Sequence, residues 1–280
     1  VKTKEDEVIL PSYVCPAVLN AVYQAGGNPV IVDIDPKSYN ISAWASKKVI
    51  TRRTRAIIVP HMFGCPADME ELIKLGIPII EDCAQSIGAT FKGRLAGSFG
   101  LVSIFSFFAT KVLTSGEGGM VLSDSQELIE KIKDLRDYDE RDSYLVRYNY
   151  KITDIQAALG LVQLARLEKF ISRRKEIATR YFEEFGKCRL DLPIWKDGKE
   201  HIYYRFVIKA REEASSYLEK LKKKRVICRR PVYLPLHVYL NLSGFPHSTE
   251  AWQKAISIPT YPSLTEREIE KIVATIREIF

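Results

Sequence analysis

The sequence predicts an α/β fold: a mostly parallel sheet flanked by helices, followed by a smaller C-terminal α+β domain. Short apolar runs typical of buried parallel strands alternate with helical patterns along the first half of the chain. The segment from Glu7 to Asp35 reads as strand, helix and strand, which is about the length that a parallel crossover needs. These two observations predict the sheet.

A third observation predicts the domain boundary. The linker at 186–200 contains Pro193 and Gly198 and follows a long helix whose second half is charged. We therefore expect a large domain over residues 1–186, including a connecting helix at 153–186, and a small domain over 187–280.

The elements of the first half follow in order. After the first strand, a turn and helix over 11–25 end at a Gly-Gly pair, and the strand PVIVDID comes next. A buried strand, AIIVP, is followed directly by His61. Because ligands bind outside the carboxyl ends of parallel strands, His61 is a candidate substrate neighbour. A loop histidine bonded to backbone is an equally favoured reading.

Three apolar runs between residues 78 and 124 are joined by polar, glycine-rich connections. The first ends at Asp82, the second ends at Ser106 shortly before Lys111, and the third follows a turn at 116–119. Charge at buried strand ends needs a partner or a ligand. Pyridoxal phosphate fits, because its aldehyde joins a lysine, its ring nitrogen pairs with a carboxylate and its phosphate needs hydroxyl and amide donors.

Four motifs occur here in a characteristic order: E-D-x-A-Q at 81–85, F-S-F at 105–107, T-K at 110–111 and G-E-G-G at 116–119. In this the chain resembles the DegT/StrS family of sugar aminotransferases, and the resemblance continues almost to the C-terminus. These are fold type I pyridoxal phosphate enzymes that aminate keto-sugar nucleotides. The resemblance therefore implies a fold type I sheet and pyridoxal 5'-phosphate as cofactor.

The resemblance also implies residue roles. Lys111 would hold the cofactor as a Schiff base and move the reaction's proton, Asp82 would pair with the ring nitrogen, Gln85 would contact the ring or its 3-oxygen, and Ser106 would bind the phosphate. Each residue also has a structural alternative. Asp82 could be a helix N-cap and Gln85 a surface residue, the Ser106 hydroxyl could bond to backbone inside a strand, and the Lys111 side chain could reach water.

Cys15 and Asn149 complete the implied cofactor site. The family often stacks an aromatic residue on the cofactor ring near position 15, where this chain has Cys15, with Tyr13 close by. Asn149 lies in a polar, aromatic loop at 136–151 that corresponds to a family loop reaching the other subunit's phosphate. The resemblance thus implies a homodimer with shared active sites. A lid or surface loop is the alternative.

The family also has several dozen residues before the point that corresponds to Glu7. They include a small-residue turn and helix start that donates amides to the cofactor phosphate. Nothing in this sequence matches that element. We therefore expect either an incomplete phosphate site in this 280-residue form or an additional upstream segment.

The second half is predicted from local signals. Helices are expected from Asp124 to about Tyr138, from a capping box of Thr153 with Gln156, over 214–224, and from a capping box starting at Thr265. Strands are expected at 202–208 and 225–228.

The segment at 229–237 resembles a family segment that lines the substrate pocket. The resemblance implies that Arg229, Tyr233 and His237 bind diphosphate or sugar hydroxyls. A salt bridge at the protein surface for Arg229, and a packed structural role for His237, are about as favoured as substrate binding.

Composition excludes other classes. The five cysteines form no CxxC pair, so we expect neither a disulfide framework nor a metal site. No apolar run is long enough to span a bilayer. We therefore expect no membrane partner, and the unpatterned cysteines indicate a reducing compartment and so a cytoplasmic location. The net charge of +7 is mixed with acids and shows no aromatic-basic stripe, so we expect no nucleic-acid partner. Abundant Lys, Arg, Glu and Ile are typical of thermophiles.

Taken together, the sequence predicts an aminotransferase that uses an amino acid donor, glutamate by family analogy, to aminate a keto-sugar nucleotide. Two alternatives stay open. A related sugar dehydratase would carry histidine in place of Lys111, so Lys111 counts against it. A non-catalytic or regulatory protein with the same fold is favoured by the absent phosphate-binding element.

Overall fold

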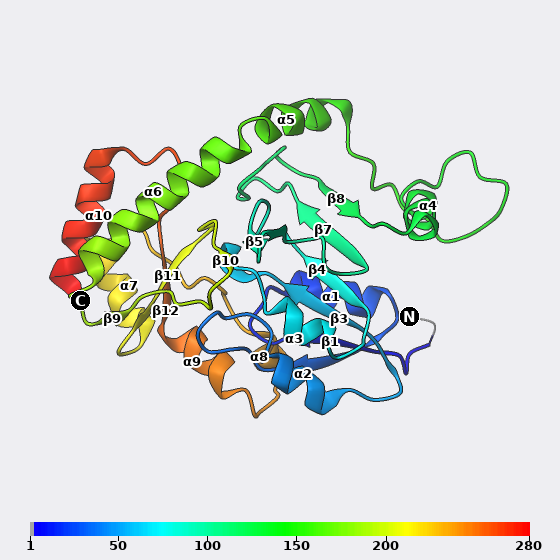
Figure 1. The fold of residues 1–280 in the computed structure, drawn as a ribbon, viewed down its shortest axis with the longest axis horizontal. Coiled ribbons are helices and arrows are strands. Elements are labelled where there is room, and N and C mark those ends of the chain that lie inside the picture. Colours follow the sequence, from blue (N-terminus) through cyan, green and yellow to red (C-terminus); the bar gives the residue numbers. More distant parts are fainter. Residues whose placement is uncertain (1–2) are drawn as a thin grey trace.

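The computed structural model describes residues 3–280 and centres on a sheet of six strands in the order β2-β1-β3-β4-β7-β8 (Figure 1). Their bounds are Asn28–Val32 (β2), Glu7–Pro11 (β1), Thr54–Pro60 (β3), Ile79–Asp82 (β4), Val102–Ser106 (β7) and Gly119–Leu122 (β8). All neighbouring strands run parallel except β7 and β8. The prediction of a mostly parallel α/β sheet is confirmed.

The central strands are buried on both faces because successive side chains point to opposite sides of the sheet. Val8 and Leu10 of β1 join one core cluster, while Ile9 joins another. The first cluster is covered by α1 (Pro16–Gln24) and the second by α3 (Met69–Ile73), and α2 (Ala43–Val49) adds partly buried residues to the second. This explains why β1 and β3 read as continuous apolar runs.

A long helical arm runs from above the sheet to the C-terminal part (Figure 1). It is two helices, α5 (Asp154–Leu164) and α6 (Leu167–Phe185), and not the single helix expected at 153–186. The break lies at Arg166, whose φ of −107° and ψ of 1° are not helical. The capping box of Thr153 and Gln156 is present as predicted.

The C-terminal part packs around a three-stranded antiparallel sheet of β9, β11 and β12, with α6, α7 and α10 contributing to its core. The remaining bounds are Leu190–Asp191 (β9), Phe206–Ala210 (β11), Ala255–Ile258 (β12), Ala214–Lys223 (α7), Leu236–Tyr239 (α8), Pro246–Lys254 (α9) and Glu266–Ile279 (α10). The predicted capping box of Thr265 and Glu268 is present.

Three local expectations need correction. The strand expected at 202–208 begins later, at Phe206. Residues 225–228 form no strand, because Arg225 has a φ of +59° and only Arg229 bridges to Ser257. Helix α4 (Gln126–Leu135) begins one residue later than expected, since the Ser125 side chain, not Asp124, accepts the capping bond from the amide of Leu128.

The segment expected as a linker is partly ordered into strands. Within it, β10 (Lys199–Glu200) pairs with β5 (Thr90–Phe91), which also pairs with β6 (Arg94–Leu95). Val207 and Leu236 of the C-terminal part also lie in the same core cluster as β1 and α1. The two parts therefore share buried surface, and the boundary near residue 186 stays a prediction.

No helix within residues 3–280 is both long and apolar enough to cross a bilayer.

Candidate active site

Asp82 is the last residue of β4 and lies at the carboxyl edge of the sheet. Its Oδ1 accepts a hydrogen bond of 3.0 Å from the amide of Ala84, and Oδ2 accepts none within residues 3–280. Burial raises the pKa of this carboxyl group, while the Ala84 amide and the charge of Lys111 act in the opposite direction. Asp82 is thus a shielded carboxylate with one oxygen open to a ligand.

Lys111 follows β7 in a loop and is half-buried. Its ammonium lies 5.5 Å from the centre of the Tyr204 ring, and within the described residues it makes no hydrogen bond or ion pair. Tyr204 comes from the C-terminal part and was not predicted as a site residue. A lysine placed beside an aromatic ring, near a carboxylate and without a bonded partner, has its amine available to a ligand.

Gln85 lies three residues after Asp82, and a hydrogen bond to its side-chain carbonyl oxygen holds the side chain in place. Oε1 accepts a hydrogen bond of 2.9 Å from the amide of Phe63, in the short turn η1 (Met62–Gly64), and Phe63 has a φ of +60°. The Nε2 donors make no other hydrogen bond within the part of the chain that the structure describes. Gln85 is therefore held in place with its donors available.

Ser106 and Cys15 lie at strand and helix ends. Ser106 ends β7, and its Oγ accepts a long bond of 3.4 Å from the amide of Phe108. Cys15 is an exposed free cysteine directly before α1. Tyr13, by contrast, is fully buried and donates to the carbonyl of Ala251. Of these two residues near position 15, only Cys15 is exposed.

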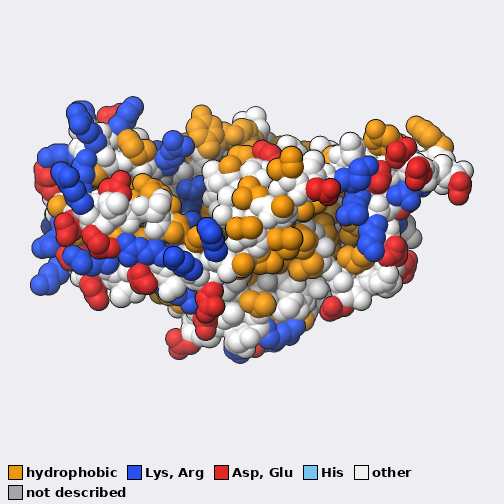
Figure 2. Space-filling view, turned by 90° about the horizontal axis from the view of Figure 1, so that it is seen from above, with side chains coloured by type: hydrophobic (Ala, Val, Ile, Leu, Met, Phe, Trp, Pro, Cys, Tyr) orange, Lys and Arg blue, Asp and Glu red, His pale blue; other side chains and the backbone are white. Residues whose placement is uncertain are grey.

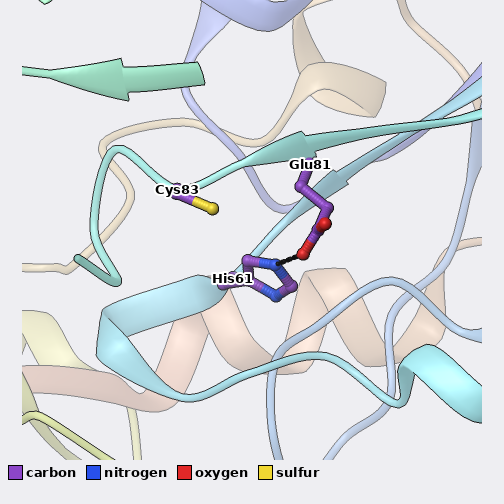
Figure 3. A group of neighbouring side chains, drawn as sticks. All are labelled: His61, Glu81 and Cys83. Carbon is purple, nitrogen blue, oxygen red and sulfur yellow. Dashed lines mark hydrogen bonds and ion pairs between the residues drawn. The ribbon is translucent and has the colours of Figure 1, made fainter. Parts of the chain in front are cut away.

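His61 lies on the neighbouring strand end but in the protein interior, beside Glu81 (Figure 3). Its Nδ1 accepts from the amide of Ala67 at 2.9 Å, so the proton sits on Nε2, which donates to Glu81 Oε2 at 2.9 Å. With both ring nitrogens occupied and 1% of its surface exposed, His61 has the geometry of a packed structural histidine.

Glu81 is fully buried, and it accepts three backbone amides besides His61. Gly97 donates to Oε2 at 2.8 Å, and Phe99 and Gly100 donate to Oε1 at 2.7 and 2.6 Å. Burial acts to raise the pKa of Glu81, but the hydrogen bond from His61 and the glycine amides outweigh it, so the pKa lies below its usual value. Glu81 fastens the loop at 97–100 to the strand that carries Asp82.

The sequence interpretation gave Glu81 no role. The sequence does contain a signal for Glu81, namely that two acidic residues stand side by side at the end of a buried strand. Because neighbouring residues of a strand face opposite sides, one of the two side chains must point inward. Asp82 faces the open edge, and Glu81 faces the interior.

His61, Glu81 and Cys83 bring possible metal-ligand atoms within 4.8 Å of one another (Figure 3). Both nitrogens of His61 and both oxygens of Glu81 are already used in hydrogen bonds. This arrangement is a hydrogen-bonded cluster that orders the strand end, and its donor set does not favour a metal.

The predicted substrate residues fall into two groups. Arg229 and Tyr233 are exposed, Tyr233 by 86%. His237 is 6% exposed; its Nδ1 lies 2.6 Å from Ser12 Oγ and its Nε2 lies 3.1 Å from Thr249 Oγ1. Burial lowers the pKa of His237. His237 thus ties the segment at 233–237 to the end of β1.

Asn149 lies in the loop that projects beside α4, at the far right of Figure 1. The residue is exposed, and its backbone bridges to Asp137. The amides of Tyr148 and Tyr150, on either side of Asn149, donate to the carbonyls of Leu135 and Arg136, so this part of the loop is held against the end of α4.

The chain matches the DegT/DnrJ/EryC1/StrS aminotransferase family over residues 1–277. It is 33% identical to a GDP-perosamine synthase of Vibrio cholerae, covering 99% of this chain and 81% of that protein. It is also 33% identical to a pleiotropic regulatory protein of Geobacillus stearothermophilus, covering 98% of this chain and 78% of the relative.

Solved structures give the same result for the fold. The aminotransferase TlmJ from Streptoalloteichus hindustanus superposes with a TM-score of 0.92 at 29% identity, covering 98% of this chain and 78% of that one. An aminotransferase from Psychrobacter cryohalolentis gives 0.91 at 26% identity, covering 98% and 81%. The expectation of a fold type I aminotransferase architecture is confirmed.

Proposed function

Because the chain belongs to the DegT/DnrJ/EryC1/StrS aminotransferase family, we propose that it is a pyridoxal phosphate-dependent transaminase acting on nucleotide sugars. It would transfer the amino group of an amino acid, glutamate by family analogy, to a keto-sugar nucleotide. The observation that carries this proposal is the pair of Asp82 and Lys111 at one edge of the sheet. Each has an open polar group, and the charge of one acts on the other.

The residues present fit the cofactor of this family. Lys111 would bind its aldehyde carbon, Asp82 its ring nitrogen, and Ser106 its phosphate, with Gln85 and Cys15 beside the ring. When bound, the cofactor supplies an electron sink for negative charge at the α-carbon of the amino acid. The half-buried carboxylate of Asp82 gains a cationic partner at the ring nitrogen, which offsets the cost of its burial.

Lys111 has the chemistry for the proton transfer. Its amine, when neutral, would remove the proton from the α-carbon of the donor as a general base and, once protonated, would deliver it to the bound cofactor as a general acid. The Tyr204 ring, whose centre lies 5.5 Å from Nζ, covers one side of the amine and would limit its contact with water.

The proposed homodimer is supported by exposed apolar side chains above the sheet. Figure 2 looks onto this face and shows them gathered in its middle, with charged groups to either side. The contributing residues on β8 and α5 are Met120, Leu122, Ile155, Leu159, Leu161, Val162 and Leu164. A soluble monomer rarely exposes so many large apolar residues on two neighbouring elements. In such a dimer, Asn149 would reach the phosphate in the other subunit.

For the substrate, we propose that Arg229 and Tyr233 contact the diphosphate and sugar. Both are exposed, and the Arg229 guanidinium makes no ion pair within residues 3–280. Since both nitrogens of His237 are occupied, its contribution would be to position this segment through Ser12. His61 is proposed as a support of the strand end and not as a substrate contact.

A regulatory, non-catalytic function is the second candidate, favoured by the relative named pleiotropic regulatory protein. The open Lys111 and Asp82 argue for catalysis, since a protein without chemistry gains nothing from an unpaired, shielded carboxylate.

Activity measurements separate the two functions. Purified protein with pyridoxal phosphate, L-glutamate and a GDP- or dTDP-linked keto sugar should form 2-oxoglutarate and amino sugar in equal amounts. Binding of the cofactor without turnover on any keto-sugar nucleotide would favour the regulatory candidate.

Asp82→Asn is expected to lower kcat roughly a hundredfold, because the neutral amide cannot stabilise a protonated ring nitrogen. Since burial raises the Asp82 pKa, the ionised carboxylate costs folding stability as pH rises above the unfolded pKa, and the cofactor-free Asn variant should melt higher than wild type at neutral pH. Calorimetry and steady-state kinetics measure the two effects. Glu278→Gln, in an exposed ion pair with Lys224, is the control that should change neither. A variant with normal kcat would remove Asp82 from the mechanism.

A further inference from the structure

A groove lies apart from Asp82 and Lys111. It has a volume of about 1020 Å³ and lies between α2, α3 and the segment at 194–199, and none of Asp82, Lys111, Gln85 and Ser106 lines it. This volume is at the upper limit of the usual range of small-molecule sites, which is about 300–1,000 Å³.

Lys199 is the buried cation of this groove. It is 8% exposed, and within residues 3–280 its ammonium makes no hydrogen bond or ion pair. The centre of the Phe91 ring lies 5.7 Å from Nζ. Burial lowers the pKa of Lys199, while the charges of Asp68 and Asp35 act in the opposite direction without forming an ion pair with it. An anion in the groove would supply the missing partner.

The other charges of the groove leave an excess of positive charge. Lys196 pairs with Asp68, and Lys74 pairs with Glu71 at 2.6 Å. The Asp35 carboxylate is taken up by its own loop, where it accepts from the amide and hydroxyl of Ser38 at 2.8 and 2.9 Å.

Three lysines, at positions 37, 47 and 199, therefore line the groove without an acidic partner in the described part of the chain. The groove is electrostatically suited to an anion.

Two indole rings line the groove. Trp44 on α2 is 68% exposed, and the Lys48 ammonium lies 3.2 Å from its ring centre, which leaves the other face of the ring for a flat ligand. Trp195 belongs to the segment at 194–199. Trp195 is fixed by Tyr203 and His201, whose ring centres lie 5.8 and 5.2 Å away. Aromatic faces beside lysines favour a planar ring that carries phosphate.

We propose that this groove binds a nucleoside phosphate at a site separate from the catalytic one, with Lys199 and Lys47 contacting phosphate and the indoles contacting the base. Binding at this site requires neither the cofactor nor Lys111. The proposal goes beyond the transaminase function and can be tested independently of it.

The test is a calorimetric titration of GDP into cofactor-free protein. Lys199→Met and Lys47→Ala should each weaken binding about tenfold or more, which corresponds to about 1.4 kcal/mol. Lys47 is exposed, so its variant keeps the proposal testable if Lys199→Met does not fold. Lys111→Ala should leave binding unchanged, and Lys224→Met, in an exposed ion pair, is the matched lysine control.

Trp44→Ala should weaken GDP binding but not the binding of inorganic phosphate. The proposal is wrong if no GDP binding is detected, if GDP binds equally well to both lysine variants, or if Lys111→Ala removes the binding. Phosphate binding as tight as that of GDP would contradict the role of the indoles.

Discussion

Lys111→Ala is expected to abolish transamination, with kcat falling by at least about a thousandfold. The substitution removes both the amine that attaches the cofactor and the base that moves the substrate proton, and proton transfer alone contributes roughly 10²–10⁴-fold. The measurement is the steady-state rate of 2-oxoglutarate formation with saturating pyridoxal phosphate.

Lys133→Ala is the matched control for this variant. Lys133 is half-exposed and pairs with Glu130 at 2.9 Å on α4, so its removal should leave kcat unchanged. Substantial activity in Lys111→Ala, with the fold intact by circular dichroism, would contradict the assignment of Lys111.

Glu81→Gln is expected to lower the free energy of unfolding by about 3 kcal/mol or more. The carboxylate accepts four hydrogen bonds, two at each oxygen. An amide has one acceptor oxygen, so its NH₂ group would face two donors, and each lost bond to a charged group costs about 1.5–3 kcal/mol. Urea denaturation measures the change.

The pH dependence of this effect has a definite sign. Because the Glu81 pKa is lowered in the folded protein, its contribution is present above the unfolded value, about 4.3, and is lost as pH falls through the folded value. The difference between wild type and Glu81→Gln should therefore shrink below about pH 4.

The control is Glu71→Gln, an exposed glutamate paired with Lys74, for which a change within about 0.5 kcal/mol is expected. An equally small change for Glu81→Gln would mean that the buried cluster does not hold the strand end.

Local signals in the sequence were enough for much of the fold. The capping boxes at Thr153 and Thr265 depend on residues three apart, and both are present. The strands that end at Asp82 and Ser106 were visible as apolar runs, since parallel strands are buried on both faces.

The predicted helix boundaries were wrong where distant residues or competing neighbouring residues determine where a helix begins or ends. The break at Arg166 was hidden because apolar periodicity continues from α5 into α6. Asp124 and Ser125 are adjacent, and both residue types are good helix N-caps. The sequence alone therefore does not show which of the two caps α4.

The same limit applies to the site. The equal readings of His61 could not be separated without knowing that Glu81, twenty residues later, lies 2.9 Å from its Nε2. Tyr204 was missed because its position against Lys111 depends on how the C-terminal part folds back.

The central claim is that Lys111 and Asp82 form a working cofactor site in this chain. The most direct measurement is an absorbance spectrum of the purified protein mixed with pyridoxal phosphate, before and after borohydride, followed by peptide mapping. The account predicts a protein-bound cofactor band that borohydride fixes onto Lys111. A folded protein that shows no such band, or carries the label on another lysine, would contradict it.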